Sequence, residues 1–202
     1  MTGVQTCALP ILIFDEVITA FGRLGAGFAA ERFGVIPDMI TCAKGLTNGA
    51  VPMGAVLVRK GIHDALMRGP ENTIELFHGY TYSGHPLAAA AGLATLDLYA
   101  GEGLYARAAA LEAHWEAGVH SLRGLPHVVD LRNLGLIAGI ELESRAGTPT
   151  TRGYDVFLDC FEQGLLVRVT GDIVALSPPL IVSIDQIDEI FTILGRAIRR
   201  VA

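Results

Sequence analysis

Short apolar runs separated by polar, glycine-rich loops dominate the first half of the chain. A run of about four apolar residues between turn residues is typical of a buried strand. Strands are predicted at Ile11–Phe14, Met39–Cys42 and Gly54–Val58. Two longer stretches predict helices, from Pro86 to about Tyr99 and from Leu104 to about Leu122, because proline suits a first helical position. This alternation indicates an α/β arrangement.

The pattern changes after Pro126, where strand-like runs become more frequent. Strands are predicted at Val128–Leu131, Leu136–Leu142, Leu165–Val169 and Ile173–Leu176, with a helix at Tyr154–Gln163. Ser183 and Gln186 have the spacing of a capping box and open a last helix. The chain is therefore divided into an α/β part, residues 11–115, and a small α+β part, residues 116–202. Residues 1–10 fit neither pattern and are expected to be a non-native leader.

Composition narrows the class of protein. The chain has 202 residues, of which 51% are apolar and 18% charged, so it can form a substantial core. Its net charge of −6 gives little reason to expect a nucleic acid as a partner. No uninterrupted apolar stretch has the length of a membrane span. The three cysteines have no CxxC spacing, so neither a metal site nor a disulfide framework is predicted and a cytoplasmic location is expected.

Two of the predicted strands are followed closely by a charged residue: Asp15 comes immediately after Phe14, and Lys44 comes two residues after Cys42. In an open α/β sheet, ligands bind at the carboxyl ends of the strands. An acid and an amine at that edge suit a cofactor that has a ring nitrogen at one end and an aldehyde at the other. Two simpler interpretations remain open: Asp15 caps the next loop, and Lys44 is a solvated lysine at a strand end. The small neighbours Ala43 and Gly45 favour a functional Lys44.

Two further features are candidates for binding anions. The hydroxyls of Thr81 and Ser83 lie in a polar loop ahead of a predicted helix, which suits a phosphate. Arg168 interrupts an apolar strand, where a guanidinium is costly unless it is paired, and its planar fork matches a carboxylate. Alternatively, Arg168 lies on the exposed face of an edge strand. His78 and His85, in the same loop as Thr81, are expected to be hydrogen-bonded scaffold residues.

Five segments resemble, in their order along the chain, the class-III or omega aminotransferases that use pyridoxal phosphate. They are LIFDEVITAFGRLG, PDMITCAKGLTNGAVPMGAV, FHGYTYSGHPLAAAAG, RNLGLIAGIEL and VRVTGDIVALSPPL. The resemblance extends from about Ile11 to the end of the chain and is greatest to members of the β-alanine–pyruvate type. It implies part of a type-I (aspartate-aminotransferase-like) pyridoxal-phosphate-binding large domain, followed by a small α+β C-terminal domain.

The resemblance also implies roles for single residues around the cofactor. Asp15 matches the acid that pairs with the pyridine nitrogen, and Val17 matches the residue packed against the ring. Lys44 matches the lysine that forms the internal aldimine and later transfers the substrate's proton. Thr81 matches the residue that binds the cofactor phosphate of the partner subunit in a homodimer, and the backbone of Tyr80 is placed to assist it.

The reaction implied by the resemblance is a ping-pong transamination. The amino donor is an omega-amino acid or a simple amine, and the acceptor is a keto acid such as pyruvate. Arg168 matches the arginine that accepts a substrate carboxylate and swings away for other amines. An aminomutase, racemase or decarboxylase of the same class is an alternative, as is a non-catalytic fragment that retains the fold.

The chain departs from this family in what it lacks. The family's large domain begins well before the strand that holds Asp15, and the missing part contributes much of the phosphate and substrate pocket. We therefore expect a C-terminal half of an enzyme, which by itself binds the cofactor poorly and has no useful activity. Unpaired sheet edges and exposed apolar faces are expected to make it prone to aggregation.

Overall fold

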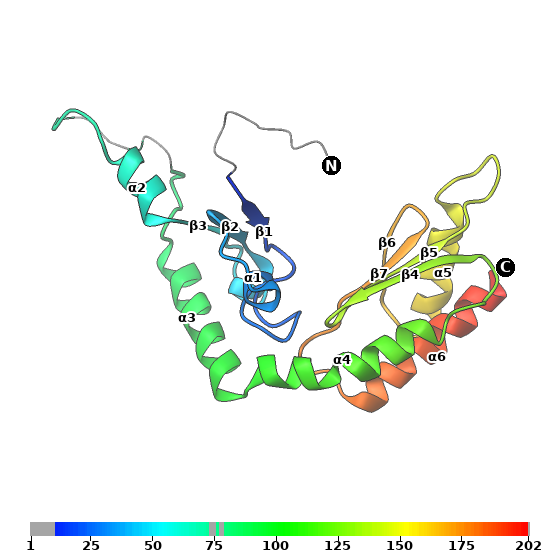
Figure 1. Ribbon diagram of the computed structural model, residues 1–202. Helices are drawn as coiled ribbons and strands as arrows, with labels where there is room; N and C mark the ends of the chain where they lie inside the picture. The colour runs from blue at the N-terminus through cyan, green and yellow to red at the C-terminus, as the bar shows by residue number, and fades with distance from the viewer. Residues whose placement is uncertain (1–10, 73–75, 77–78, 202) are drawn as a thin grey trace, which may run out of the picture. The chain divides into compact units, whose positions relative to one another are not determined.

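The structure is a computed structural model that describes residues 11–72, 76 and 79–201, and its packing divides the chain into two compact units (Figure 1). The first unit contains the chain up to Phe21 together with Gly27–Glu102. The second contains Gly22–Ala26 together with the chain from Gly103 onward. The proposed leader, residues 1–10, and His78 lie outside the described residues.

The first unit contains a three-stranded sheet in the order β1-β2-β3. Strand β1 (Ile13–Asp15) is parallel to β2 (Met39–Cys42), and β2 is antiparallel to β3 (Ala55–Val58). The other elements are α1 (Ala29–Phe33), the single 3-10 turn η1 (Lys44–Leu46), α2 (Lys60–Leu66) and α3 (Pro86–Gly101). The strand predicted at Met39–Cys42 is confirmed, and the other two are found within two residues of their predicted bounds.

The described apolar core of the first unit lies around an aromatic cluster rather than under the strands. The ring of Phe21 packs against Phe28 and Tyr99, with ring centroids 5.7 and 6.2 Å apart. Strand residues are less well covered, since Ile13 is 54% exposed and Val56 is 63% exposed. Much of the apolar surface of this sheet is therefore open in the chain as it stands.

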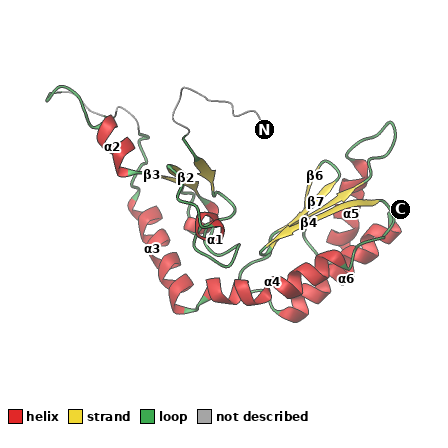
Figure 2. Cartoon of the chain, in the orientation of Figure 1, coloured by secondary structure: helices red, strands yellow, loops and turns green. Residues whose placement is uncertain are grey.

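The second unit contains a four-stranded antiparallel sheet in the order β4-β5-β7-β6, coloured yellow in Figure 2. Its strands are β4 (Val128–Leu134), β5 (Ile137–Leu142), β6 (Arg168–Thr170) and β7 (Ile173–Leu176). Its helices are α4 (Leu104–His120), α5 (Thr151–Glu162) and α6 (Ile184–Arg200). With one sheet in each unit, the predicted α/β class is confirmed.

One face of the second sheet is well buried. Along β5 the burial alternates, so that Ala138, Ile140 and Leu142 are buried while the residues between them are half-exposed, as the two-residue period of a strand requires. Helices α4 and α6 pack against each other, and α4 also contacts β4. Trp115 of α4 is fully buried and meets Phe191 of α6 edge to face, with ring centroids 5.0 Å apart. This unit therefore has a core of its own.

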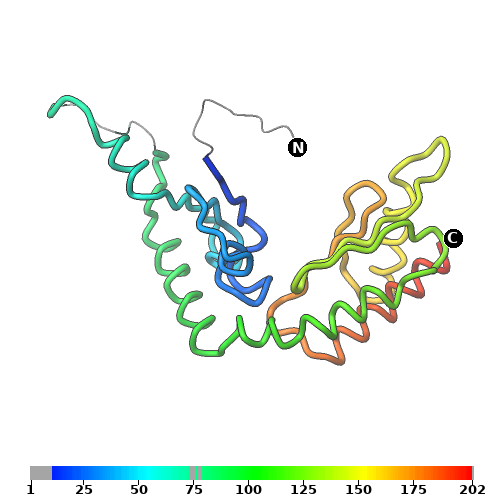
Figure 3. Tube along the Cα trace, viewed as in Figure 1, coloured from blue at the N-terminus to red at the C-terminus, as the bar shows by residue number. Residues whose placement is uncertain are grey.

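Two predicted strands need correction. Strand β4 continues to Leu134, whereas the sequence predicted a loop over Arg132–Gly135, because Leu134 still pairs with Ile137 of β5. The tube in Figure 3 follows the hairpin formed by β4 and β5. The hairpin turns at Gly135, whose φ of 53° and close approach to the carbonyl of Arg23 suit glycine. The strand predicted at Leu165–Val169 begins only at Arg168, the first of its residues to pair with β7.

The end of the chain agrees with its sequence signals. Ser183 caps α6, with its hydroxyl accepting from the amide of Gln186 and the Gln186 side chain accepting from the amide of Ser183. The predicted capping box is therefore confirmed. Among the helices in the described part of the chain, none combines the length and apolar character needed to cross a membrane.

Candidate functional site

Asp15 is the last residue of β1, and its side chain is exposed. Its Oδ1 accepts hydrogen bonds from the Val17 amide at 3.1 Å and from the Thr41 hydroxyl at 3.4 Å. The first of these bonds is the loop cap of the simpler interpretation. Both donors reach the same oxygen, so within the described residues Oδ2 is available to a further donor. The cap therefore orients the carboxylate without occupying it fully.

Lys44 begins η1, two residues beyond the end of β2, and is exposed. Because β1 and β2 are parallel, Asp15 and Lys44 lie at the same edge of the sheet. None of the ion pairs in the described part of the chain involves the Lys44 amine. Lys60, the chain's other lysine, forms an ion pair with Asp64 at 2.6 Å. The two lysines therefore have different surroundings.

Glu16 is a buried carboxylate that the sequence did not reveal as part of this region. Next to the exposed Asp15 it points the opposite way, as strand geometry predicts, and it is 1% exposed. Its carboxylate accepts from the amides of Ala29 and Ala30 at 2.7 and 2.9 Å and from the Thr19 hydroxyl at 2.8 Å. It thereby caps the start of α1, which has no capping side chain at its N-cap position.

The other residues assigned to the cofactor by the resemblance also belong to the first unit. Val17 is half-buried. Tyr80 and Thr81 are exposed in the loop before α3, where the amide of Tyr80 donates to the Ser83 hydroxyl at 3.1 Å. Pro86 is the first residue of α3, as predicted. The polar loop therefore leads directly into a helix N-terminus.

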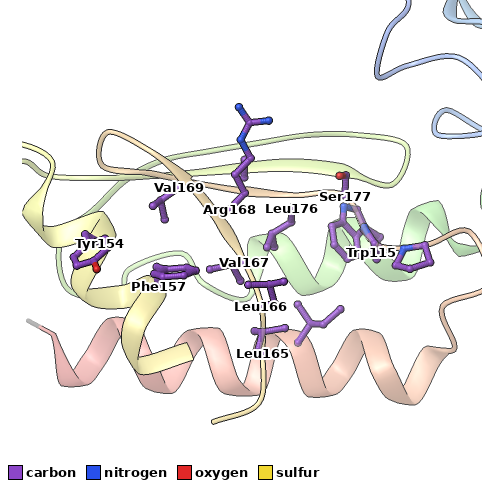
Figure 4. Close-up of a pocket in the computed structure, with 14 residues that line it drawn as sticks. Trp115, Tyr154, Phe157, Leu165, Leu166, Val167, Arg168, Val169, Leu176 and Ser177 are labelled. Carbon is purple, nitrogen blue, oxygen red and sulfur yellow. The ribbon is translucent and has the colours of Figure 1, made fainter. Parts of the chain in front are cut away.

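Arg168 lies in the second unit, at the start of the edge strand β6, and is exposed. It borders a cavity of about 570 Å³ whose other walls are mostly apolar. Figure 4 shows its guanidinium extending away from the apolar side chains of Leu166, Val167 and Phe157. Arg132, in contrast, is paired with Glu141 at 2.6 Å and with Asp130. Arg168 is therefore the more available of the two guanidinium groups.

Neither described cysteine suits a nucleophile. Cys42 and Cys160 are both buried and unpaired. Burial raises the pKa of the Cys42 thiol, and it raises the pKa of Cys160 to about 12. A thiolate is therefore disfavoured at both positions at neutral pH. Neither described cysteine is therefore a candidate nucleophile.

Comparisons with known proteins relate the chain to transaminases. The family model described as aminotransferase class-III matches residues 8–198. An omega-aminotransferase of Caulobacter vibrioides is 62% identical over 191 residues, which are 95% of this chain and 44% of the relative. A beta-alanine–pyruvate aminotransferase of Pseudomonas aeruginosa is 46% identical, with 95% of this chain and 43% of the relative covered.

Solved structures give the same relationship. An (S)-enantioselective omega-transaminase from Thermomicrobium roseum superimposes with a TM-score of 0.86 at 35% identity, covering 95% of this chain and 43% of that one. A PLP-bound amine transaminase from an uncultivated Pseudomonas species also gives 0.86 at 35% identity, covering 95% and 45%. The chain therefore spans less than half the length of these relatives.

Proposed function

Because the chain belongs to the class-III aminotransferase family, we propose that it provides part of a pyridoxal-phosphate-dependent transaminase. The proposed donors are omega-amino acids or amines, and the acceptor is a keto acid such as pyruvate. The observation that carries the proposal is the placement of Asp15 and Lys44 at the ends of neighbouring parallel strands. The names of the relatives, which include an omega-aminotransferase and a beta-alanine–pyruvate aminotransferase, support the substrate class.

The residues at this sheet edge have the chemistry that the two ends of a pyridoxal ring require. Asp15 is held through Oδ1, and its Oδ2 would be available to the ring nitrogen, where a charge-assisted hydrogen bond would favour the protonated ring. When bound, the cofactor supplies an electron sink for the substrate carbon that bears the amino group. Val17, half-buried beside Asp15, offers an apolar contact to the ring face.

Lys44 has two tasks in this proposal. Its primary amine would hold the aldehyde end of the cofactor, and the small residues Ala43 and Gly45 on either side leave room for a bulky group. The same amine, at Nζ, would be the base for the proton on the substrate carbon that bears the amino group. One amine can serve as nucleophile and as base when it lies beside that carbon.

Thr81 and Arg168 bind the charged ends of cofactor and substrate in this proposal. The Thr81 hydroxyl binds the phosphate of the cofactor in the partner subunit of a homodimer, assisted by the backbone of Tyr80. Arg168 accepts a substrate carboxylate with its planar guanidinium. In domain terms, residues 11–115 belong to the type-I large domain and residues 116–202 to the small C-terminal domain.

Trapping the bound aldehyde by reduction tests the role of Lys44. The 202-residue chain is incubated with pyridoxal phosphate, treated with borohydride and digested, and the labelled lysine is identified by mass spectrometry. Since Lys44 and Lys60 are its only lysines, Lys60 is an internal control. We expect Lys44 to be labelled at least about tenfold more than Lys60. This ratio corresponds to the free energy of one charge-assisted hydrogen bond between Asp15 and the cofactor ring.

Two variants sharpen this test. Asp15→Asn should lower labelling of Lys44 by about tenfold and leave Lys60 unchanged, since only the ring contact is weakened. Lys44→Ala should abolish the selective label. Equal labelling of the two lysines in the unaltered chain would contradict the proposed role.

The same proposal includes an expectation about turnover. The chain alone should bind the cofactor poorly and have no useful transaminase activity, because the apolar strand residues of its first unit are open rather than packed into a closed site. Alanine formation from pyruvate and an amine donor measures this directly. Alanine formed above the level given by free pyridoxal phosphate would refute the expectation.

A further inference from the structure

Lys44 has an unusual backbone conformation. Its φ is 45°, in the left-handed region that residues with a side chain rarely adopt. Such a conformation persists only where the surrounding structure holds it. The short turn η1 has three local backbone bonds, in which the amides of Leu46, Thr47 and Asn48 donate to the carbonyls of Ala43, Lys44 and Gly45 at 3.0, 3.3 and 3.4 Å. Because all three join residues three positions apart, support from outside the turn is expected to fix its position.

Tyr99 of α3 supplies a hydrogen bond to this turn. Its hydroxyl donates to the carbonyl oxygen of Gly45 at 2.7 Å. Tyr99 is 7% exposed, so the bond is shielded from competing water. The contact joins the residue after Lys44 to a helix 54 positions further along the chain. The position of the turn therefore depends on α3.

Phe21 also packs close to Gly45. Its ring stacks on Tyr99 with an interplanar angle of 17°, and it is 7% exposed. A methyl group added at Gly45 would lie 2.9 Å from Cβ of Phe21, which is too close for an ordinary contact. Gly45 therefore fits against Phe21 while its carbonyl is bound by Tyr99.

We propose that Tyr99 and Phe21 are positioning residues that hold the strained turn carrying Lys44, and thereby present its amine at the sheet edge. The value of this positioning for chemistry rests on the proposed function, because it concerns the same lysine. Neither residue is proposed to touch the reacting atoms. They act through Gly45, and Tyr99 contributes a hydroxyl that can be removed without disturbing its ring.

Tyr99→Phe is the direct test, with Tyr154→Phe as a matched control, because Tyr154 is half exposed and lies on α5 in the other unit. The first readout is amide hydrogen exchange at Leu46 and Thr47. We expect it to accelerate by about fivefold in Tyr99→Phe, the change that one neutral hydrogen bond supports, and to stay unchanged in the control.

The second readout is the ratio of pyridoxyl label on Lys44 to that on Lys60 after borohydride reduction. It should fall by about fivefold in Tyr99→Phe, because the amine is no longer held in one place. Gly45→Ala disturbs the contact with Phe21 and should lower the same ratio. Circular dichroism checks that each variant remains folded, and Lys60 corrects for general changes in reactivity.

The outcomes separate the two proposals. Unchanged exchange at Leu46 and Thr47 in Tyr99→Phe would overturn the positioning role. Selective labelling of Lys44 that survives the substitution would overturn it as well, while leaving the proposed function intact. Equal labelling of Lys44 and Lys60 in the unaltered chain would contradict the proposed function, and the exchange measurement would still decide whether Tyr99 holds the turn.

Discussion

The sheets of the two units differ in how their apolar residues are covered. In the second unit, Ile140 and Val174 are fully buried in the middle of their strands. In the first unit, Ile13, Val56 and Leu57 are each about half exposed or more. Burying an aliphatic side chain contributes about 1.5–3 kcal/mol relative to leaving it in water. The second unit therefore has a buried apolar core that can stabilise it, whereas apolar strand residues of the first unit are exposed to solvent.

The two units nevertheless use the same device at one helix each. At the start of α1, the Glu16 carboxylate accepts hydrogen bonds from the amides of Ala29 and Ala30. At the start of α5, the Asp172 carboxylate accepts hydrogen bonds from the amides of Thr150 and Gly153. Both carboxylates are buried. A negative charge at a helix N-terminus also interacts favourably with the helix dipole. The two helix caps are thus alike, whereas the units around them differ in how well their apolar residues are buried. Substituting each capping carboxylate tests how much that difference in burial affects stability.

The largest effect is expected for Asp172→Asn. The new amide would face backbone donors and the Ser144 hydroxyl, so at least one buried donor loses its acceptor. We expect a loss of about 2–3 kcal/mol in the free energy of unfolding. Urea unfolding followed by the fluorescence of Trp115, the only tryptophan, measures it in this unit. Asp185→Asn, an exposed acid in the first turn of α6, is the control and should cost less than about 1 kcal/mol.

The stability difference between the parent chain and Asp172→Asn should depend on pH. Burial alone would raise the pKa of Asp172, but bonds from Ser144, Gly153 and Thr150 and the charge of Arg152 lower it overall. A lowered pKa in the folded state means that the stabilisation is complete above the unfolded value, about 3.9, and is lost as the pH falls through the folded one. The difference between parent and Asp172→Asn should therefore shrink below about pH 4. A difference that grows on acidification would contradict this assignment.

A smaller and more local effect is expected for Glu16→Gln. The five-residue helix α1 has little stability of its own to lose. Amide exchange at Ala29 and Ala30 should accelerate by about tenfold, equivalent to about 1.4 kcal/mol. The Trp115 unfolding midpoint should not move, and Glu31→Gln, an exposed acid in the same helix, should have less effect on exchange. A shift of that midpoint would show that the two units do not unfold independently.

The sequence predicted those strands whose apolar runs end abruptly. Met39–Cys42 and Ile173–Leu176 are found with their predicted bounds. Arg132–Leu134 was predicted as loop because its residues are polar in part, yet cross-strand pairing with β5 extends the strand through them. Leu165 was predicted to begin a strand, but its amide bonds to the carbonyl of Cys160 at the end of α5. Cross-strand pairing decided the first case, and the hydrogen bond that closes the end of α5 decided the second; a run of apolar residues shows neither.

The candidate site shows the same limit. Asp15 and Lys44 could be found because each follows a recognisable strand, and they lie at one edge as expected. Their roles toward a cofactor stay predictions. Glu16, Phe21 and Tyr99 gave no sequence signal, because each acts through a partner that is distant along the chain or through its backbone. A lone tyrosine in a helix cannot be distinguished from ordinary core until its hydroxyl partner is known.

The short segment Gly22–Ala26 has a consequence for anyone who would cut or graft this chain. It belongs to the second unit, where Leu24 is 1% exposed and the carbonyl of Arg23 accepts from the amide of Leu136 at 2.8 Å. The second unit is therefore not formed by one continuous segment of the sequence. A gene fragment that starts at Gly103 omits part of the core of this unit. A protease that nicks the chain near Glu102 would leave this small piece of the second unit on the other fragment.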